Sequence, residues 1–278
     1  PVLAATLEGP TPSDTVVRFL DANADIETDY GDNFVSSIEG VEGSTVDGGA
    51  ADWFFFVNGV YSELGAGEVE VEVGDRIWWD HRVWSEAYRV PVVVGSFPEP
   101  FLHGYPGGAA GAIVECVAAA PGCDGVAGSL RDAGVETRLE EVDEPVAHPD
   151  DIRVLVGSWD ELRADPAARL IERGPGESGV YAAMNECAPG DWQLEALGSD
   201  AEVRRIVSDG GFVAAVRRGE DAPTFLVAGL EPRGVEVAAA IFAEEALRDR
   251  YAVAAADGGQ PVALPAPDSA EPVRSGCG

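Results

Sequence analysis

The chain has 278 residues, of which 46% are hydrophobic and 24% charged, a composition typical of one large globular domain or two ordinary ones. There are 50 acidic residues and 18 basic ones, all of the latter arginine, and the formal net charge is −32. Nucleic-acid phosphates and anionic membrane surfaces repel such a chain, so we expect neither as a partner. No apolar run reaches the roughly 18 residues that a membrane helix needs, so we expect no direct membrane insertion.

The first stretch, residues 1–97, is predicted to be a domain of strands with one early helix. Residues 2–7 have the pattern of a short strand. Ser13 or Thr15 can cap a helix that continues to about residue 24. Residues 34–38 are predicted to form the next strand.

The clearest local signal is Asn58-Gly59, a dipeptide that accepts positive φ at both positions of a type I′ turn. Apolar strands flank it, at residues 53–57 and 60–61. Residues 68–73 then alternate Glu and Val, which predicts a strand with one apolar face.

Gly74-Asp75 is predicted to turn the chain into another strand, residues 76–81, and residues 88–94 to extend the same sheet. One helix against a mixed sheet of four or five strands is the β-grasp pattern. We therefore expect the first stretch to be a β-grasp-like domain.

The first stretch resembles the transcobalamin-like C-terminal domain family. The resemblance is carried by the W-x4-NG hairpin beginning at Trp53, the GD-x-I-x-W strand beginning at Gly74, and residues 14–20 and 34–38. The resemblance covers about residues 10–95. It implies a β-grasp module of secreted or lipid-anchored bacterial proteins, and it suggests cobalamin as a ligand. The extension after Trp79 is similar to that of actinobacterial members that carry a second α/β half.

Residues 98–111 are rich in Pro and Gly and are predicted to be a linker. From residue 112 to 256, Ala-rich helices alternate with Val-rich strands, which predicts an α/β sandwich domain. Residues 257–278 show no periodicity and are predicted to be an extended tail. The expected fold class is α+β, with an N-terminal β-grasp-like domain followed by an α/β sandwich domain.

Individual elements of the second domain also have sequence signals. Ser158 and Glu161 form a capping box, which predicts a helix up to about residue 173, bent at Pro166. The other predicted helices are residues 124–133 and 234–250, and the predicted strands are residues 112–118, 135–142, 152–156, 180–184, 192–197, 212–217 and 224–228.

The four cysteines suggest where the protein resides. The C-x6-C spacing of Cys116 and Cys123 matches no familiar zinc motif, and neither Cys187 nor Cys277 has a second metal ligand nearby. We therefore predict the disulfides Cys116–Cys123 and Cys187–Cys277, with four reduced, buried thiols as the alternative. Because disulfides persist in oxidising compartments, the protein is expected to be extracytoplasmic, either secreted or tethered to the cell envelope.

A cluster of aromatic and polar side chains within residues 78–89 is the best candidate binding site. Side chains alternate along a strand, so Trp78 and Trp79 face opposite sides and one of them must lie away from the domain core. That ring lines a ligand groove or packs against the second domain. The predicted ligand-binding residues are Trp79, His81, Arg82, Trp84 and Tyr88.

An acidic segment near residue 25 has the spacing of a calcium loop, with candidate ligands at Asp21, Asn23, Asp25, Glu27 and Asp32. Ile26 stands where such a loop needs Gly, and Asp32 stands where it needs Glu. A solvated acidic loop is therefore the preferred interpretation, with calcium as the alternative. No other metal site is predicted, and the sequence indicates no cofactor.

No catalytic motif was found. Residues 176–179 nearly spell a nucleophile elbow, but Val180 stands where the motif needs Gly. We therefore expect no enzyme and no catalytic residues. The leading hypothesis is an extracytoplasmic small-molecule binding protein, with a flat organic ligand such as a cobalamin, that feeds a transporter. The alternative is a cell-surface protein that assembles with copies of itself or with a surface partner through a β-grasp edge strand.

Overall fold

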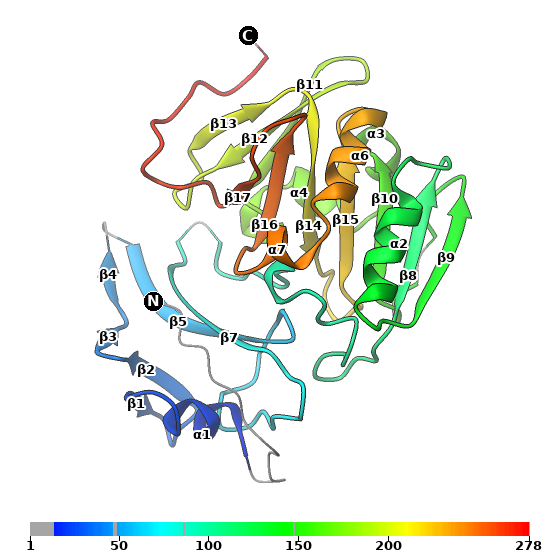
Figure 1. The fold of residues 1–278 in the computed structure, drawn as a ribbon. Coiled ribbons are helices and arrows are strands. Elements are labelled where there is room, and N and C mark those ends of the chain that lie inside the picture. The colour runs from blue at the N-terminus through cyan, green and yellow to red at the C-terminus, as the bar shows by residue number, and fades with distance from the viewer. Residues whose placement is uncertain (1–13, 47–48, 86, 147, 278) are drawn as a thin grey trace.

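The computed structural model describes residues 14–46, 49–85, 87–146 and 148–277 (Figure 1). Helices and several separate sheets make up the chain, which confirms the α+β class. The predicted strand at residues 2–7 and the cap at Ser13 lie outside the described residues.

The N-terminal part contains one helix and two small sheets. Helix α1 (Val16–Asp21) packs through Val16 and Leu20 into a core shared with Phe55. The first sheet has the order β1 (Ile26–Asp29), β2 (Phe34–Ile38), β3 (Val41–Glu42). In the second, β4 (Ser44–Val46), β6 (Val60–Tyr61) and β7 (Ile77–Val83) all pair with β5 (Gly49–Val57).

The predicted hairpin is confirmed, because β5 and β6 pair Val57 with Val60 across the turn. Asn58 has φ +53° and Gly59 φ +76°. At Gly59 a side chain would also be excluded, since a Cβ there would lie 2.9 Å from the carbonyl oxygen of Val93.

Two predicted strands of this part are wrong. Residues 68–73 form a single bridge, Glu70 with Thr15, because this segment runs beside the entry to α1 and buries Val69 and Val71 in the same core. Residues 88–94 make only the bridge between Val60 and Val92. Here the valines fill the space between the two parts of the chain instead of extending a sheet.

The second part is built on a mixed seven-stranded sheet, with parallel pairing among β8, β9, β10 and β15 and antiparallel pairing for the rest (Figure 1). The order is β17 (Val262–Leu264), β16 (Ala252–Ala256), β14 (Gly210–Val216), β15 (Thr224–Gly229), β10 (Arg153–Ser158), β8 (Ala112–Val117), β9 (Thr137–Val142).

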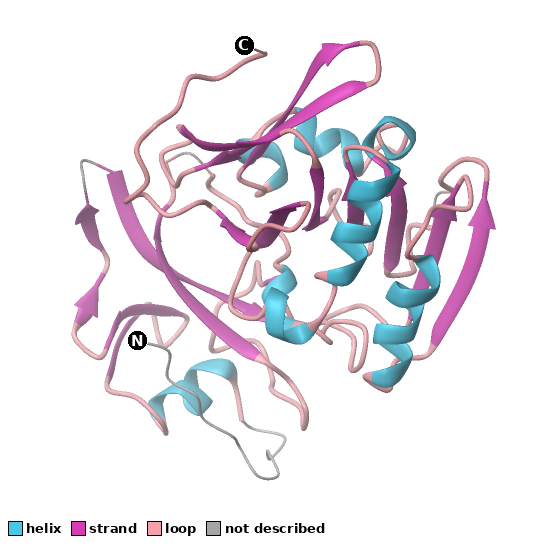
Figure 2. Cartoon of the chain, turned by 45° about the horizontal axis from the view of Figure 1, so that its top comes forward, coloured by secondary structure: helices cyan, strands magenta, loops and turns pink. Residues whose placement is uncertain are grey.

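Both faces of this sheet are covered (Figure 2). Helices α2 (Cys123–Asp132) and α6 (Pro232–Ala240) lie on one face and bury Leu130 and Val235. The other face carries α3 (Trp159–Leu162), α4 (Ala168–Glu172), α5 (Pro175–Ser178) and the antiparallel sheet β11 (Ala182–Ala188), β12 (Asp191–Leu197), β13 (Val203–Val207).

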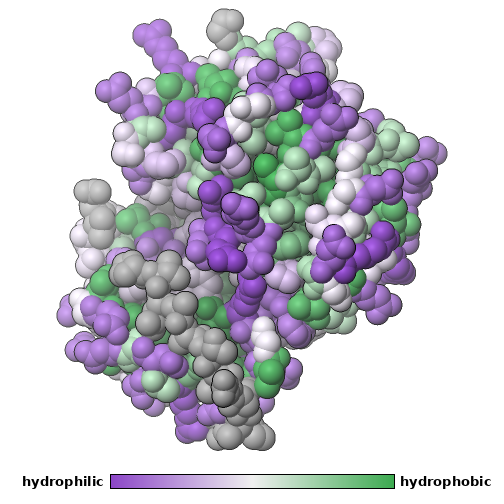
Figure 3. Space-filling model, viewed as in Figure 1, coloured by the Kyte–Doolittle hydropathy of each residue, from purple (hydrophilic) through white to green (hydrophobic). Residues whose placement is uncertain are grey.

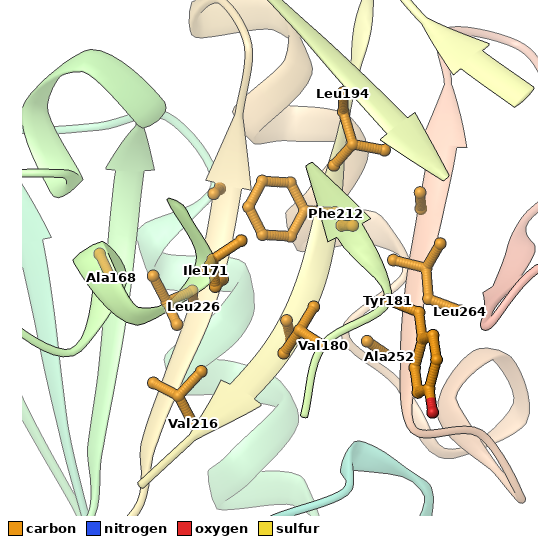
Figure 4. Packing of buried hydrophobic residues seen from close by; sticks show 14 of the residues in the cluster. Ala168, Ile171, Val180, Tyr181, Leu194, Phe212, Val216, Leu226, Ala252 and Leu264 are labelled. Carbon is orange, nitrogen blue, oxygen red and sulfur yellow. The ribbon is translucent and has the colours of Figure 1, made fainter. Parts of the chain in front are cut away.

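The core on this second face joins distant segments (Figure 4). Ile171 of α4 and Leu194 of β12 pack against Phe212 and Leu226 from the large sheet. Leu264 of β17 lies in the same cluster. The C-terminal segment is therefore part of the fold and not only an extended tail, which corrects the prediction for residues 257–278.

Two predicted helices are interrupted. The capping box at Ser158 is present, with the backbone N–H of Ser158 donating to Glu161 at 3.1 Å, but α3 ends before Pro166 and α4 begins after it. Residues 234–250 form α6 and then the separate short helix α7 (Glu244–Leu247). The buried Phe242 lies between these two helices and is packed into the core.

Residues 98–111, expected to be a linker, are packed against the large sheet. Phe101 is almost fully buried and its ring centroid lies 4.6 Å from that of Phe225 in β15. The carbonyl oxygen of Gly104 accepts a hydrogen bond from Asn58 at 2.9 Å. The buried Phe101 ring therefore fixes the position of a segment whose Pro and Gly content had predicted a flexible linker.

The two parts of the chain are in direct contact. The Trp78 ring lies 5.7 Å from the Tyr251 ring, and the Tyr251 hydroxyl hydrogen-bonds Asp80. The Arg76 guanidinium pairs with Glu244 of α7 at 3.0 Å. Of the two alternatives for the outward-facing tryptophan, packing against the second part therefore holds for Trp78.

Both predicted disulfides are present, Cys116–Cys123 and Cys187–Cys277. The second joins β11 to the end of the C-terminal segment, over a sequence separation of 90 residues. In the described part of the chain, no helix is long and apolar enough to cross a bilayer.

Candidate ligand-binding groove

A groove of about 380 Å³ lies on the N-terminal part, and we call it the aromatic groove. Half of its 16 lining residues are aromatic. They are Phe34, Trp53, Phe54, Phe55, Tyr61, Trp79, Trp84 and Tyr88; the remaining wall is formed by Asn33, Val35, Asp52, Ser62, Glu63, Leu64, Gly65 and Ala66.

The floor of the groove is one edge of β5. β7 pairs with residues 51–57 along one edge, whereas on the opposite edge β4 reaches only residues 49–51 and β6 only residues 56–57. Residues 52–54 have no strand partner on that edge within the described ladders, and the Phe55 carbonyl oxygen accepts a hydrogen bond from the Ser62 N–H at 3.3 Å. All four residues, 52–55, line the groove. Because successive side chains point to opposite faces, four consecutive lining residues mean that the backbone edge itself forms the floor.

Apolar side chains are exposed at the walls of this groove. Tyr88 is 58% exposed, Leu64 57% and Phe34 37%. Single exposed apolar residues are ordinary on a protein surface, but three around one concave site mark a place where burial by a ligand is favourable. At about 25 cal/mol per Å², covering such side chains contributes on the order of 1 kcal/mol each.

The polar end of the groove is organised around Asp52. Its Oδ2 accepts a hydrogen bond from Trp84 Nε1 at 2.8 Å, which fixes the indole plane. The Trp84 and Tyr88 rings are 5.4 Å apart at an interplanar angle of 78°. Two nearly perpendicular aromatic walls therefore stand beside one carboxylate.

The groove continues into a cleft of about 340 Å³ between the two parts of the chain. Tyr61, Glu63 and Tyr88 line both spaces. The far wall of the cleft includes Glu177 and Arg217 from the second part. A ligand longer than the aromatic groove would therefore meet polar groups from both parts.

Tyr61 lies where groove and cleft meet. Burial raises the pKa of its phenol above the ordinary value of 10.0, and the neighbouring Tyr88 raises it further. Deeper between the two parts, burial raises the pKa of Tyr251 well above 10.0, with the carboxylate of Asp80 adding to the shift. Both phenols therefore remain neutral hydrogen-bond donors at physiological pH.

Three of the five predicted ligand-binding residues, Trp79, Trp84 and Tyr88, come together in the groove. His81 does not line it: its ring packs 5.0 Å from Trp53, on the same face of the sheet as Trp79.

Arg82 also lies outside the groove wall. Its guanidinium sits 4.0 Å over the Phe54 ring and donates to Asp80 at 2.7 Å. Among the described residues, its Nε and Nη2 have no hydrogen-bond partner. Burial raises the pKa of Tyr251 in the second part and the nearby Arg82 charge opposes that shift, so Arg82 lies between the two parts and does not line the groove.

The calcium candidates Asp21, Asn23, Asp25, Glu27 and Asp32 do not form a ligand cluster, and no group of three or more His, Cys, Asp or Glu side chains in the described part of the chain could hold a metal. Ile26–Asp29 form β1, whose extended backbone turns Glu27 and Asp29 outward. Asn23 instead donates to the carbonyl oxygen of Phe19, and Asp32 accepts from Thr28.

The opposite wall of the groove, residues 33–35 and 61–66, was not predicted from the sequence. Leu64 in a polar turn was the available signal, because an apolar side chain there has no strand or helix to bury it. No sequence pattern identified Asp52 as a site residue, because a single carboxylate does not stand out in a chain with 50 acidic residues.

No curated protein matches the chain. Over residues 13–82, the chain is similar to the family described as a domain of unknown function (DUF4430). This range overlaps residues 10–95, for which the sequence predicted a family resemblance.

Proposed function

We propose that this protein is a non-enzymatic, extracytoplasmic binding protein that holds a flat organic ligand in the aromatic groove. The observation that carries the proposal is the groove itself, a concave site with half its lining aromatic and three exposed apolar side chains at its walls. Planar aromatic walls with a few fixed polar groups are typical of sites for small organic ligands.

The location of the protein and the finer family assignment belong to the same proposal. Two disulfides support an oxidising compartment. The DUF4430 match overlaps the residues that resemble the transcobalamin-like family, which makes a corrinoid the first flat ligand to test. We further propose an actinobacterial cell-envelope protein, tethered as a lipoprotein, that delivers its ligand to a transporter.

Tryptophan fluorescence tests this function, because three tryptophans line the groove. The wild-type protein is titrated with a corrinoid and with smaller flat heterocycles, and one site per chain is expected. Tyr88→Ala removes an exposed wall and is expected to weaken binding by about tenfold. Tyr30→Ala is the matched control, since Tyr30 is 86% exposed and lies outside the groove wall. Equal affinities for the two variants, or no saturable binding, would contradict the proposal.

One observation favours a second function, assembly through a strand edge. The edge of β5 at residues 52–54 has no strand partner in the described ladders, and an unpaired edge is a template for β-pairing. Sedimentation equilibrium separates the two functions. Self-association through this edge predicts dimers or larger species that a flat groove ligand dissociates, whereas the binding function predicts a monomer with and without ligand.

A further inference from the structure

We propose that the aromatic groove selects a ligand that carries a cationic group, either an organic ammonium or a delocalised aromatic cation. This inference rests on the proposed binding function and adds the charge of the ligand to it. The features that carry it are the two perpendicular rings beside Asp52 and the distribution of charge around them.

The ring geometry suits a cation. The faces of Trp and Tyr rings are electron-rich, and a cation within about 6 Å of a ring centroid is attracted to them. Trp84 and Tyr88 offer two such faces at 78° to each other, which allows one cation to contact both rings at once. Aromatic rings arranged in this way recognise quaternary and methylated ammonium groups in other proteins.

The charges of the groove point the same way. Among the residues that the structure describes, its lining contains two carboxylates, Asp52 and Glu63, and no cationic side chain. Glu63 is paired with Arg89 at 2.7 Å. Among the described residues Asp52 makes no ion pair, and its Oδ2 accepts only the neutral indole N–H of Trp84.

Arg82 is the guanidinium that could neutralise Asp52, because it stands directly across from Asp52 in the ladder of β5 and β7. Its Nη1 is directed to Asp80 at 2.7 Å and not to Asp52. The guanidinium charge of Arg82 over the Phe54 ring is thus paired with the carboxylate of Asp80. The negative charge of Asp52 is left for a ligand.

The whole molecule reinforces this preference. Its net charge is −32, and hydrophilic residues are spread over both parts of the visible face (Figure 3). Such a field attracts cations to the surface and repels anions, with a range of about 8 Å at physiological ionic strength. An anionic flat ligand would therefore meet repulsion both at long range and at Asp52.

Three ring-matched tricyclic probes test the inference by isothermal titration calorimetry at pH 8: N-methylacridinium as the cation, acridine as the neutral probe and acridine-9-carboxylate as the anion. We expect the cation to bind about tenfold more tightly than acridine, and the anion to bind more weakly than both. Raising the salt concentration should weaken the binding of the cation and leave that of acridine unchanged.

Asp52→Asn isolates the carboxylate, since the amide oxygen can still accept the Trp84 hydrogen bond. It is expected to weaken binding of the cation by about fivefold and to leave acridine unaffected. Asp21→Asn removes the same charge from an exposed position outside the groove wall and should change neither affinity.

The outcomes separate this inference from the proposed function. If acridine and N-methylacridinium bind with equal affinity, and Asp52→Asn changes neither, the charge preference is wrong while the groove remains a binding site. If none of the three probes binds, both the charge preference and the groove as a flat-ligand site are wrong. A preference for the cation that stays at about tenfold in Asp52→Asn would overturn the assigned role of Asp52.

Discussion

Removing the Cys187–Cys277 disulfide by the double substitution to Ala is predicted to cost much of the stability of the fold. The bridge closes a loop with a sequence separation of 90 residues. In the chain-entropy treatment, such a cross-link removes about 4.6 kcal/mol of conformational freedom from the unfolded chain. Cys277 is exposed and Cys187 only partly buried, so little packing is lost with the two sulfurs.

Urea unfolding measures this cost. The free energy of unfolding should fall by about 4 to 5 kcal/mol, and the m-value should rise because the unfolded chain is no longer held together by a long cross-link. Removing Cys116–Cys123 gives the comparison, because its separation of seven residues corresponds to a loop contribution of about 2.5 kcal/mol. A loss below about 1 kcal/mol for the long bridge, with an unchanged m-value, would show that the cross-link does not stabilise the fold by restricting the unfolded chain.

Two further predictions concern charged contacts. Glu115→Gln should destabilise the fold by about 3 kcal/mol in urea unfolding, because Glu115 is fully buried and Arg153 Nε lies 3.0 Å from its Oε1; an unchanged midpoint would contradict this. The hydrogen bond from Arg76 lowers the pKa of Glu244, so the contact stabilises the fold above the unfolded pKa of this carboxyl and is lost as pH falls through the lowered value. The stability difference between wild type and Glu244→Gln should therefore vanish in acid, and parallel pH profiles would count against it.

Local signals predicted much of the fold correctly. The Asn58-Gly59 dipeptide determined the hairpin because only residues that tolerate positive φ fit its turn. The buried strands β8, β10 and β15 appeared as short apolar runs, which is what a sheet covered on both faces requires. The disulfide pairs followed from cysteine spacing and were confirmed.

Long-range packing determined what could not be predicted. Residues 68–73 alternate like a strand, but their apolar side chains fill the core beneath α1 and the backbone makes only one bridge. β17 is only three residues long. It forms because it pairs with the edge strand β16 and buries Leu264 in the core. No local pattern distinguishes such a segment from an extended tail.

The candidate site was predicted in part for the same reason. Trp79, Trp84 and Tyr88 were identified as an aromatic cluster and do line the groove. The missing wall depends on where β4 and β6 stop covering β5, which is a property of the assembled sheet. His81 and Arg82 were included in the prediction because they are close in sequence to the aromatic residues, although His81 packs against Trp53 and Arg82 lies over Phe54 and donates to Asp80.

Native mass spectrometry of the protein purified from its source without added ligand tests whether the aromatic groove holds a small molecule. We expect a single chain carrying one small-molecule adduct, which is lost from a Trp84→Ala variant prepared in the same way and retained by Tyr30→Ala. Bare chains, or bare multiples of the chain mass, would contradict the binding function and favour assembly through the β5 edge.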